Sequence, residues 1–275
     1  MGQVLALGVS MRLIAGSLFW ASIAAFGYAL WHLNDFPSTP FTETLNAPQQ
    51  EALVSPSERT VHIEEESYLV KGLYDYKLDG LVVSMRHHDS DRGLHKQWKD
   101  HINVADLCVL WGDSAQSPHL NAINFWSGRF TCFMDTQSEI AFNSILGHEL
   151  SNNHLLSNDP RMRERIQSAD IGDHVRIRGY LANYRNLTTH GFRGTSTNRF
   201  DTGDGACETI WVTDFQVVGH HKSGYRYLAL GAALTLLVSI YFFFRAPKPG
   251  SQLTDRERNL LDRARKKTAK APAAQ

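Results

Sequence analysis

The chain has 275 residues, 28 basic and 28 acidic side chains, and 13 histidines. The charge is unevenly distributed: residues 245–275 carry nine Lys or Arg and three acids, whereas residues 33–226 carry 18 basic and 25 acidic residues. Because non-specific nucleic-acid binding needs a clustered positive face, the acidic middle of the chain excludes that class of function.

Two apolar segments frame the acidic middle. Leu13–Trp31 has 19 residues without a charge, and Tyr227–Phe244 has 18. At ~1.5 Å per residue, a helix of either length crosses a hydrocarbon core of about 30 Å. We predict two transmembrane helices in contact with lipid, rather than buried core helices. A cleaved signal peptide is the alternative for the first segment, but its apolar stretch is longer than a typical signal core.

The basic C-terminal segment sets the expected orientation. Cationic flanks stay in the cytoplasm, so residues 245–275 are expected inside, and two spans place residues 1–12 inside as well. Residues 32–226 then face the periplasm or the exterior. Within the tail, Thr254 and Glu257 form a capping-box pattern ahead of Leu260 and Leu261, which predicts a short amphipathic helix lying on anionic lipid.

The middle region divides at about residue 60. Residues 32–60 contain four prolines among polar residues and are predicted to be a linker. Residues 61–220 show short apolar runs separated by polar turns, which predict a β-rich domain. The expected strands are Tyr68–Lys71, Asp79–Met85, Ala105–Trp111, Arg129–Met134, His174–Tyr184 and Glu208–Val218, and the expected helices are Gln137–Leu146 and Asp159–Ala169.

Six short strands with few helices favour a small α+β domain built on an OB-like barrel. The segment from Gly172 to Leu181 supports this class: a Gly-Asp turn precedes an alternating strand, and Gly179 permits a sharp bend in it. This strand resembles one found in many OB-fold barrels. The nucleic-acid binding common in that fold does not carry over to an acidic, exported domain.

The three cysteines are Cys108, Cys132 and Cys207. In an exported domain two of them are expected to be bonded. Cys108 and Cys132 both lie in strand-like segments, and a bridge between them would close a loop of about 25 residues, worth roughly 3–4 kcal/mol. We favour that pair and a free Cys207, although three cysteines allow three pairings.

The first polar cluster comprises His87, His88, Asp89, His95, Asp100 and His101. Imidazoles and carboxylates are ligands for first-row metals, so a metal-binding module is one hypothesis. Adjacent histidines on a strand point to opposite faces, however, and no standard zinc spacing is present. A polar loop after a strand is the simpler interpretation, and no metal or other cofactor is predicted.

The second cluster runs from His148 to His154. His148, Asn152, Asn153 and His154 offer hydrogen bonds to a ligand, or a general base for catalysis. Pairs of asparagines are also common in turns, because Asn tolerates the left-handed conformation. A turn is the favoured interpretation here.

The third cluster, Arg193–Glu208, is the densest. An Arg199–Asp201 pair is expected to order the loop, and backbone N–H groups near Gly203 and Gly205 could hold an anion. Cys207 and Glu208, with a distant histidine such as His148 or His154, would form a thiol-nucleophile arrangement. A salt-bridged loop is favoured over a ligand site, and a ligand site over catalysis.

Three segments carry a resemblance to a known group: Ser151–Leu155, Gly172–Tyr180 and the loop from Thr195 to Glu208. Together they resemble a group of bacterial two-span inner-membrane proteins that have a periplasmic β-rich domain and no assigned activity. The resemblance covers most of residues 70–218. It implies a bacterial inner-membrane location and supplies no catalytic residue.

Three functional hypotheses follow. The first is a non-enzymatic envelope protein whose periplasmic domain binds an envelope partner. The second is an envelope hydrolase that uses Cys207 or the His148/His154 pair. The third is the metal-binding module of the His87–His101 cluster. The candidate partner site of the first hypothesis is the set His148, Asn152, Asn153, His154, Arg199, Asp201 and Glu208.

Overall fold

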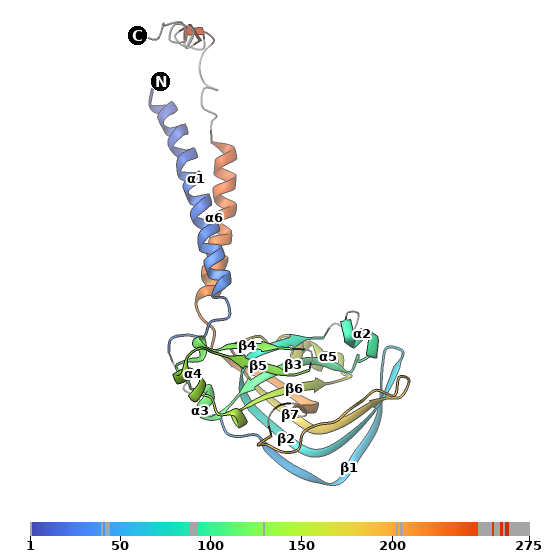
Figure 1. Cartoon of the computed structure of the whole chain (residues 1–275). Helices are drawn as coiled ribbons and strands as arrows, with labels where there is room; N and C mark the ends of the chain where they lie inside the picture. The colour runs from blue at the N-terminus through green and yellow to red at the C-terminus, as the bar shows by residue number, and fades with distance from the viewer. Residues whose placement is uncertain are drawn as a thin grey trace, which may run out of the picture. The chain divides into compact units, whose positions relative to one another are not determined.

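The structure is a computed structural model that describes residues 2–39, 41, 45–88, 93–128, 130–201, 203, 206–246, 255, 259–260 and 262–263. Side chains are described from residue 11 onward, except those of residues 93–95. The chain forms two compact units: residues 1–33 with 224–275, and residues 34–223. Figure 1 shows the helices and strands of both units.

The first unit is built on two long apolar helices, α1 (Gly2–Trp31) and α6 (Tyr225–Arg245). The segments Met11–Trp31 and Tyr225–Arg245 are each 21 residues long and apolar enough to cross a membrane. Both helices include the segments predicted from the sequence. This confirms a chain with two candidate membrane helices at the ends of a folded domain.

The two helices pack against each other in antiparallel fashion. At one end, the Arg12 guanidinium donates to the carbonyl oxygen of Ala246 at 3.1 Å. At the other end, the ring of His32 stacks on Tyr225 with centroids 5.0 Å apart. A cation at one end and aromatic rings at the other match the side chains that favour the headgroup layers.

The second unit contains a seven-stranded sheet and a separate two-stranded ribbon. The strands are β1 (Gln49–Ile63), β2 (Glu66–His87), β3 (Asn103–Leu110), β4 (Asn124–Ser127), β5 (Cys132–Asp135), β6 (Leu150–Leu156), β7 (Asp173–Asn186), β8 (Phe192–Arg193) and β9 (Glu208–His220). The sheet order is β1-β2-β3-β6-β9-β7-β8, and β2 also pairs with β7. The pairing therefore returns to β2 after passing through β3, β6, β9 and β7. All pairs are antiparallel except β6–β9.

Strand β2 joins two segments that were predicted as separate strands. It is 22 residues long, and its pairing register shifts near Gly72 and again between Val82 and Ser84. These irregularities let one strand contact β1, β3 and β7 along its length, because a bulge bends and twists a strand. The curved strand is visible in Figure 1.

Residues 49–60 were predicted to lie in a linker, and this part of the prediction is wrong. They belong to the edge strand β1, which pairs with β2 from Gln49 to Ile63. Pro56 lies where the pairing breaks, between Ala52 and Ser57. Proline lacks an N–H and is tolerated on an edge strand or at a bulge, so proline content alone did not exclude a strand.

The buried core lies inside the ring of strands. Its largest fully buried side chains include Tyr76, Leu81, Leu107, Ile177 and Phe215, which come from four different strands. A smaller buried cluster around Tyr68, Ile102 and Trp211 closes one end. The domain therefore has an apolar interior, in which a buried polar side chain needs a hydrogen-bond or ion-pair partner.

The helices of this unit are short. They are α2 (Gly93–Trp98), α3 (Gly112–Ala115), η1 (Leu120–Ala122), α4 (Glu139–Asn143), η2 (Gly147–Glu149) and α5 (Pro160–Gln167). Helices α4 and α5 lie within the two predicted helical segments. As predicted for α5, Asp159 is the N-cap: its carboxylate accepts a hydrogen bond from the backbone N–H of Arg161, and Pro160 occupies the first turn.

Strand β7 begins and bends at glycines, as predicted. Gly172 has a φ of +84°, a left-handed value that glycine adopts without strain, just before the strand starts. At Gly179, an added Cβ would lie 2.1 Å from the Trp211 carbonyl oxygen. The pairing of β7 with β9 shifts register between Arg178 and Gly179. A side chain at position 179 is therefore incompatible with the close approach of β9.

Strand β6 corrects the turn predicted over His148–His154. Leu150–Leu156 forms a strand that pairs antiparallel with β3 and parallel with β9. The two neighbouring strands satisfy its backbone, which outweighs the turn preference of two asparagines. The predicted amphipathic helix of the tail lies mostly outside the described residues, among which Leu260 is exposed.

Candidate functional site

The three cysteines lie as predicted. Cys108 on β3 and Cys132 on β5 form a disulfide, with Cα atoms 5.8 Å apart. Cys207 is a free, half-buried thiol at the start of β9. The disulfide attaches the β4–β5 ribbon to the sheet beside the point where β6 and β9 run parallel.

A cavity of about 280 Å³ opens at this point, and we call it the thiol pocket. Its lining includes Cys132, Cys207 and five of the seven residues predicted to form the partner site. Those five are His148, Asn152, Arg199, Asp201 and Glu208. Strand β6 contributes Asn152, strand β9 contributes Glu208, and the loop before β9 contributes Arg199 and Asp201.

His154 lies directly below the pocket and is 1% exposed. Its Nε2 atom is 3.4 Å from the carboxamide nitrogen of Asn152, which shares its face of β6. Asn153 lies on the opposite face, where its carboxamide donates to the Leu107 carbonyl at 3.2 Å. Since side chains alternate along a strand, the structure separates Asn153 from the other predicted residues.

Asp106 is the residue of this site that the sequence interpretation missed. It is the register partner of His154 on the neighbouring strand, and its carboxylate lies 2.5 Å from His154 Nδ1 and 3.0 Å from His88 Nε2. Burial opposes ionisation of Asp106, yet the two imidazoles hold its pKa well below the usual range. A lone aspartate inside the apolar strand 104–110 was the available signal, because a buried carboxylate requires partners.

Arg193 binds the other nitrogen of the same imidazole. Its Nη1 lies 2.8 Å from His154 Nε2, and its guanidinium stacks 4.3 Å from the Phe130 ring centroid. Arginine only donates hydrogen bonds, so Nε2 accepts from Arg193 only when His154 is neutral with its proton on Nδ1. Burial lowers the pKa of His154 but the Asp106 carboxylate raises it to about 9. Protonation of His154 and the Arg193 contact are mutually exclusive.

Cys207 completes a thiol–imidazole–carboxylate series. Its Sγ donates to the Phe130 carbonyl at 3.2 Å and accepts from the Asn152 carboxamide at 3.6 Å, and its interaction with His154 raises the pKa of that imidazole. Asp106, His154 and Cys207 thus occur in the order that activates a cysteine nucleophile. Activation needs Nε2 free to take the thiol proton, however, and Arg193 occupies that nitrogen.

Arg199 pairs with Glu208, and not with Asp201 as predicted. The Arg199–Glu208 ion pair is largely buried, and Arg199 Nη1 also lies 3.4 Å from the Tyr76 hydroxyl. Asp201 instead accepts a hydrogen bond from Ser196 Oγ at 2.6 Å. Burial raises the pKa of Glu208 to about 7 against the opposing effect of Arg199. Glu208 Oε2 has no partner among the described residues.

Exposed aromatic side chains lie at or beside the wall of the thiol pocket. Phe200 is 76% exposed, and its ring lies 5.6 Å from that of His148 on the pocket wall. Phe133 also lines the pocket, is 44% exposed, and stacks on Trp126 at 5.2 Å. We call Phe200, Phe133 and Trp126 the aromatic rim.

The predicted metal cluster does not converge among the described residues. His88 contacts Asp106, whereas His101 contacts Glu64 at 3.1 Å. Asp100 instead accepts a hydrogen bond from the Tyr184 hydroxyl. Asp89 and the side chain of His95 lie outside the described residues, and within the described part no group of three His, Cys, Asp or Glu side chains fits a metal ion.

Comparisons of the chain with protein-family models, curated proteins and solved structures find no match.

Proposed function

We propose that the chain is a bacterial inner-membrane protein with both termini in the cytoplasm and residues 32–226 in the periplasm. Two antiparallel candidate membrane helices and the basic segment that follows Arg245 support this topology. A reporter fused after Gln275 tests it directly. Activity of a cytoplasm-specific reporter is expected, and activity of a periplasm-specific reporter would overturn the orientation.

We further propose that the folded domain is an OB-like barrel. Two features support this class: the closed pairing order β2-β3-β6-β9-β7, and the single parallel pair β6–β9. Helix α5 follows β6 and precedes β7, so it connects the third and fourth of the five ring strands in chain order. A small Greek-key barrel with its ligand surface on strands and loops is the arrangement expected of this class.

The function that the geometry supports best is non-enzymatic binding of an envelope protein partner at the thiol pocket and its aromatic rim. The observation that carries this proposal is a set of exposed aromatic side chains at a pocket lined by Arg199: Phe133 lines the pocket, Phe200 lies beside its wall residue His148, and Trp126 stacks on Phe133. Aromatic residues and arginine are enriched at protein interfaces, and a cluster of exposed rings is uncommon elsewhere on a soluble surface.

The arrangement beneath the pocket favours binding over catalysis. When His154 is neutral with its proton on Nδ1, Arg193 donates to Nε2, so the imidazole then has no free acceptor for the Cys207 proton. Arg193 is itself held by its stack on Phe130. The Phe130 carbonyl in turn accepts hydrogen bonds from Asn152 and Cys207, which line the pocket. These contacts give a partner a preorganised surface, because a side chain locked by neighbours loses little entropy on binding.

Photo-crosslinking in cells tests the proposal. Benzoyl-phenylalanine is incorporated at Phe200 in one strain and at Val54 in another, since Val54 is highly exposed on the edge strand β1. A discrete adduct with an envelope protein is expected from position 200 and none from position 54. Equal adducts from both positions, or none from position 200, would contradict partner binding at the rim.

An envelope hydrolase remains the second candidate, because Cys207, His154 and Asp106 are correctly ordered for thiol catalysis. In that case Arg193 must leave Nε2 when substrate binds. The discriminating measurement is the rate of Cys207 alkylation by iodoacetamide as a function of pH, in the wild type and in the His154→Ala variant. An activated thiol would react at least tenfold faster in the wild type at pH 6; equal rates would remove this candidate.

A further inference from the structure

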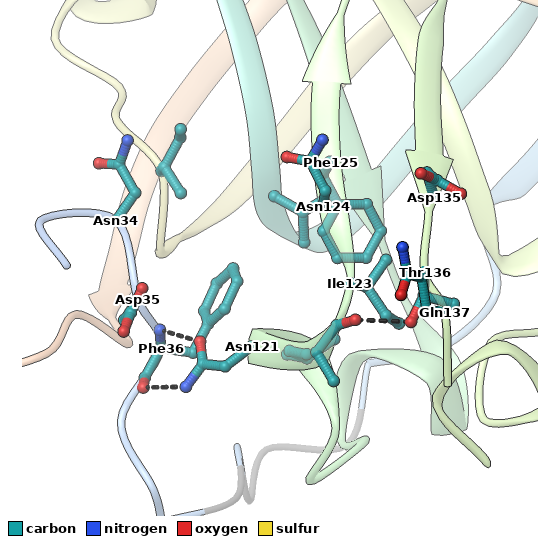
Figure 2. Close-up of a pocket in the computed structure, with 14 residues that line it drawn as sticks. Asn34, Asp35, Phe36, Asn121, Ile123, Asn124, Phe125, Asp135, Thr136 and Gln137 are labelled. Carbon is teal, nitrogen blue, oxygen red and sulfur yellow. Dashed lines mark hydrogen bonds between the residues drawn. The ribbon is translucent and has the colours of Figure 1, made fainter. Parts of the chain in front are cut away.

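A second cavity lies at the β4–β5 ribbon and is separate from the thiol pocket. It has a volume of about 550 Å³, within the range of about 300–1,000 Å³ typical of small-molecule sites. Figure 2 shows its two facing walls, one from residues 34–36 and the other from β4, β5 and the residues after β5. We call it the amide pocket, after the Asn and Gln side chains that line it.

Two side chains fix the walls of the amide pocket. The Asn121 carboxamide donates to the Phe36 carbonyl at 2.9 Å and accepts from the Phe36 N–H at 2.7 Å. Thr136 Oγ1 donates to the Ala122 carbonyl at 2.6 Å. These are the dashed contacts in Figure 2. Each holds a lining segment in place, so the cavity is formed without a ligand.

Four other polar side chains of the pocket make no side-chain hydrogen bond to the described part of the chain. They are Asn34, Asn124, Asp135 and Gln137, and all four are exposed. Asn124 and Asp135 are directly opposite each other across the β4–β5 ribbon. Figure 2 shows Asn34 on one wall and the other three on the facing wall. Three carboxamides and one carboxylate are therefore available to a ligand between the walls.

Apart from Asp35, the rest of the lining is apolar and includes aromatic rings. Phe36 and Ile123 are buried beneath the polar groups, and the ring of Phe125 is half-buried. A carboxamide both donates and accepts hydrogen bonds, which matches a hydroxyl group that does the same. Apolar rings beside planar amides suit a ligand that has hydroxyls at its edge and C–H groups on its faces.

Charge narrows the ligand class further. Among the described residues, the lining has two carboxylates, Asp35 and Asp135, and no Lys, Arg or His. A phosphate or carboxylate ligand would meet negative charge without a cationic partner, which is unfavourable in a partly enclosed site. We propose that the amide pocket binds a neutral saccharide of the cell envelope.

The test is saccharide titration of the full chain in a detergent without a sugar headgroup, measured by calorimetry and saturation-transfer NMR. The neutral probes are triacetylchitotriose, with acetamido groups, and maltotriose, without them. Trigalacturonic acid and chitotriose supply matched anionic and cationic comparisons. Saturable binding of a neutral probe is expected, at least tenfold tighter than either charged probe. Tighter binding of a charged probe, or no saturable binding of either neutral one, would overturn the proposal.

A triple variant locates the binding. Asn124→Ala/Asp135→Ala/Gln137→Ala removes three free polar groups from exposed positions and is expected to weaken saccharide binding at least tenfold. Gln167→Ala, an exposed amide at the end of α5, is the matched control and is expected to bind as the wild type does. Unchanged binding in the triple variant, with its melting temperature also unchanged, would show that the sugar binds elsewhere.

Discussion

The thiol pocket and the amide pocket differ in how their polar groups are satisfied. Next to the thiol pocket, His154 is in contact with both Asp106 and Arg193 beneath the surface. In the amide pocket, Asn124 and Asp135 are exposed and make no side-chain hydrogen bond to the described residues. A buried charge must have a protein partner, whereas an exposed amide is satisfied by water. The first pocket should therefore contribute to folding and the second mainly to binding.

Asp106→Ala is expected to give the largest effect. It leaves His154 and His88 without their shared carboxylate in a buried site, so the free energy of unfolding should fall by about 3–5 kcal/mol. Chemical denaturation of the full chain, followed by tryptophan fluorescence, measures it. Asp135→Ala in the amide pocket is the matched control, with a change below about 0.5 kcal/mol. Similar losses of stability in the two variants would contradict the proposed difference between the two pockets.

Removal of the disulfide should have the next largest effect. Cys108→Ser/Cys132→Ser opens a link between residues 24 apart, which the chain-entropy model values at about 3 kcal/mol. Cys207→Ser changes a half-buried free thiol and should cost less than about 1 kcal/mol. Denaturation of both variants under non-reducing conditions gives the two values. A Cys207→Ser loss as large as that of the double variant would mean that the thiol has a structural role not seen in its contacts.

The pH dependence of stability should reveal Glu208. Its folded pKa of about 7 lies above its ordinary value of 4.5, because burial disfavours the charged form. The folded state therefore holds the proton more tightly, and stability that is complete below pH 4.5 is lost as the pH rises through about 7. In Glu208→Gln this loss should disappear.

The control for Glu208 is Glu58→Gln, on an exposed ion pair with Lys71. Its pH profile between 4.5 and 7 should follow that of the wild type. The measurement is the free energy of unfolding at half-unit pH intervals. If Glu208→Gln keeps the wild-type slope, Glu208 is ionised throughout this range. The ion pair with Arg199 then lowers the pKa of Glu208 by more than burial raises it.

The smallest effect on stability is expected from Asn124→Ala/Asp135→Ala/Gln137→Ala. Its three side chains make no hydrogen bond to the described residues, so thermal unfolding should differ from the wild type by no more than about 1 °C. Differential scanning calorimetry measures the change. A loss of several degrees would show that these groups stabilise the fold, and that the amide pocket does not serve mainly for binding.

Much of the domain was predictable from local patterns. The alternation Val175, Ile177, Gly179, Leu181 predicted β7, and Asp159-Pro160 predicted the start of α5. Both features depend on short-range geometry, which a local sequence pattern reports. The disulfide pair also followed from two strand-like segments. Strands β1 and β6 were missed, since proline and paired asparagines disfavour strands locally and only pairing with distant neighbours overrides that preference.

The site was predictable as a set of residues but not as a network. His148, Asn152, Arg199, Asp201 and Glu208 do meet at one pocket. The partners of His154 were not foreseen, because Asp106 is 48 residues away in sequence and Arg193 is 39 residues away. Which carboxylate meets Arg199 depended likewise on the register of β9 beside β6.

The central claim is that the thiol pocket and its aromatic rim bind a partner without catalysis. The most direct measurement is the photo-crosslink from position 200 in a Cys207→Ser background. The account predicts the same adduct at the same yield, because the thiol takes no part in partner binding. Loss of the adduct in Cys207→Ser, with the protein still folded and in the membrane, would contradict non-enzymatic binding and favour a thiol-dependent reaction.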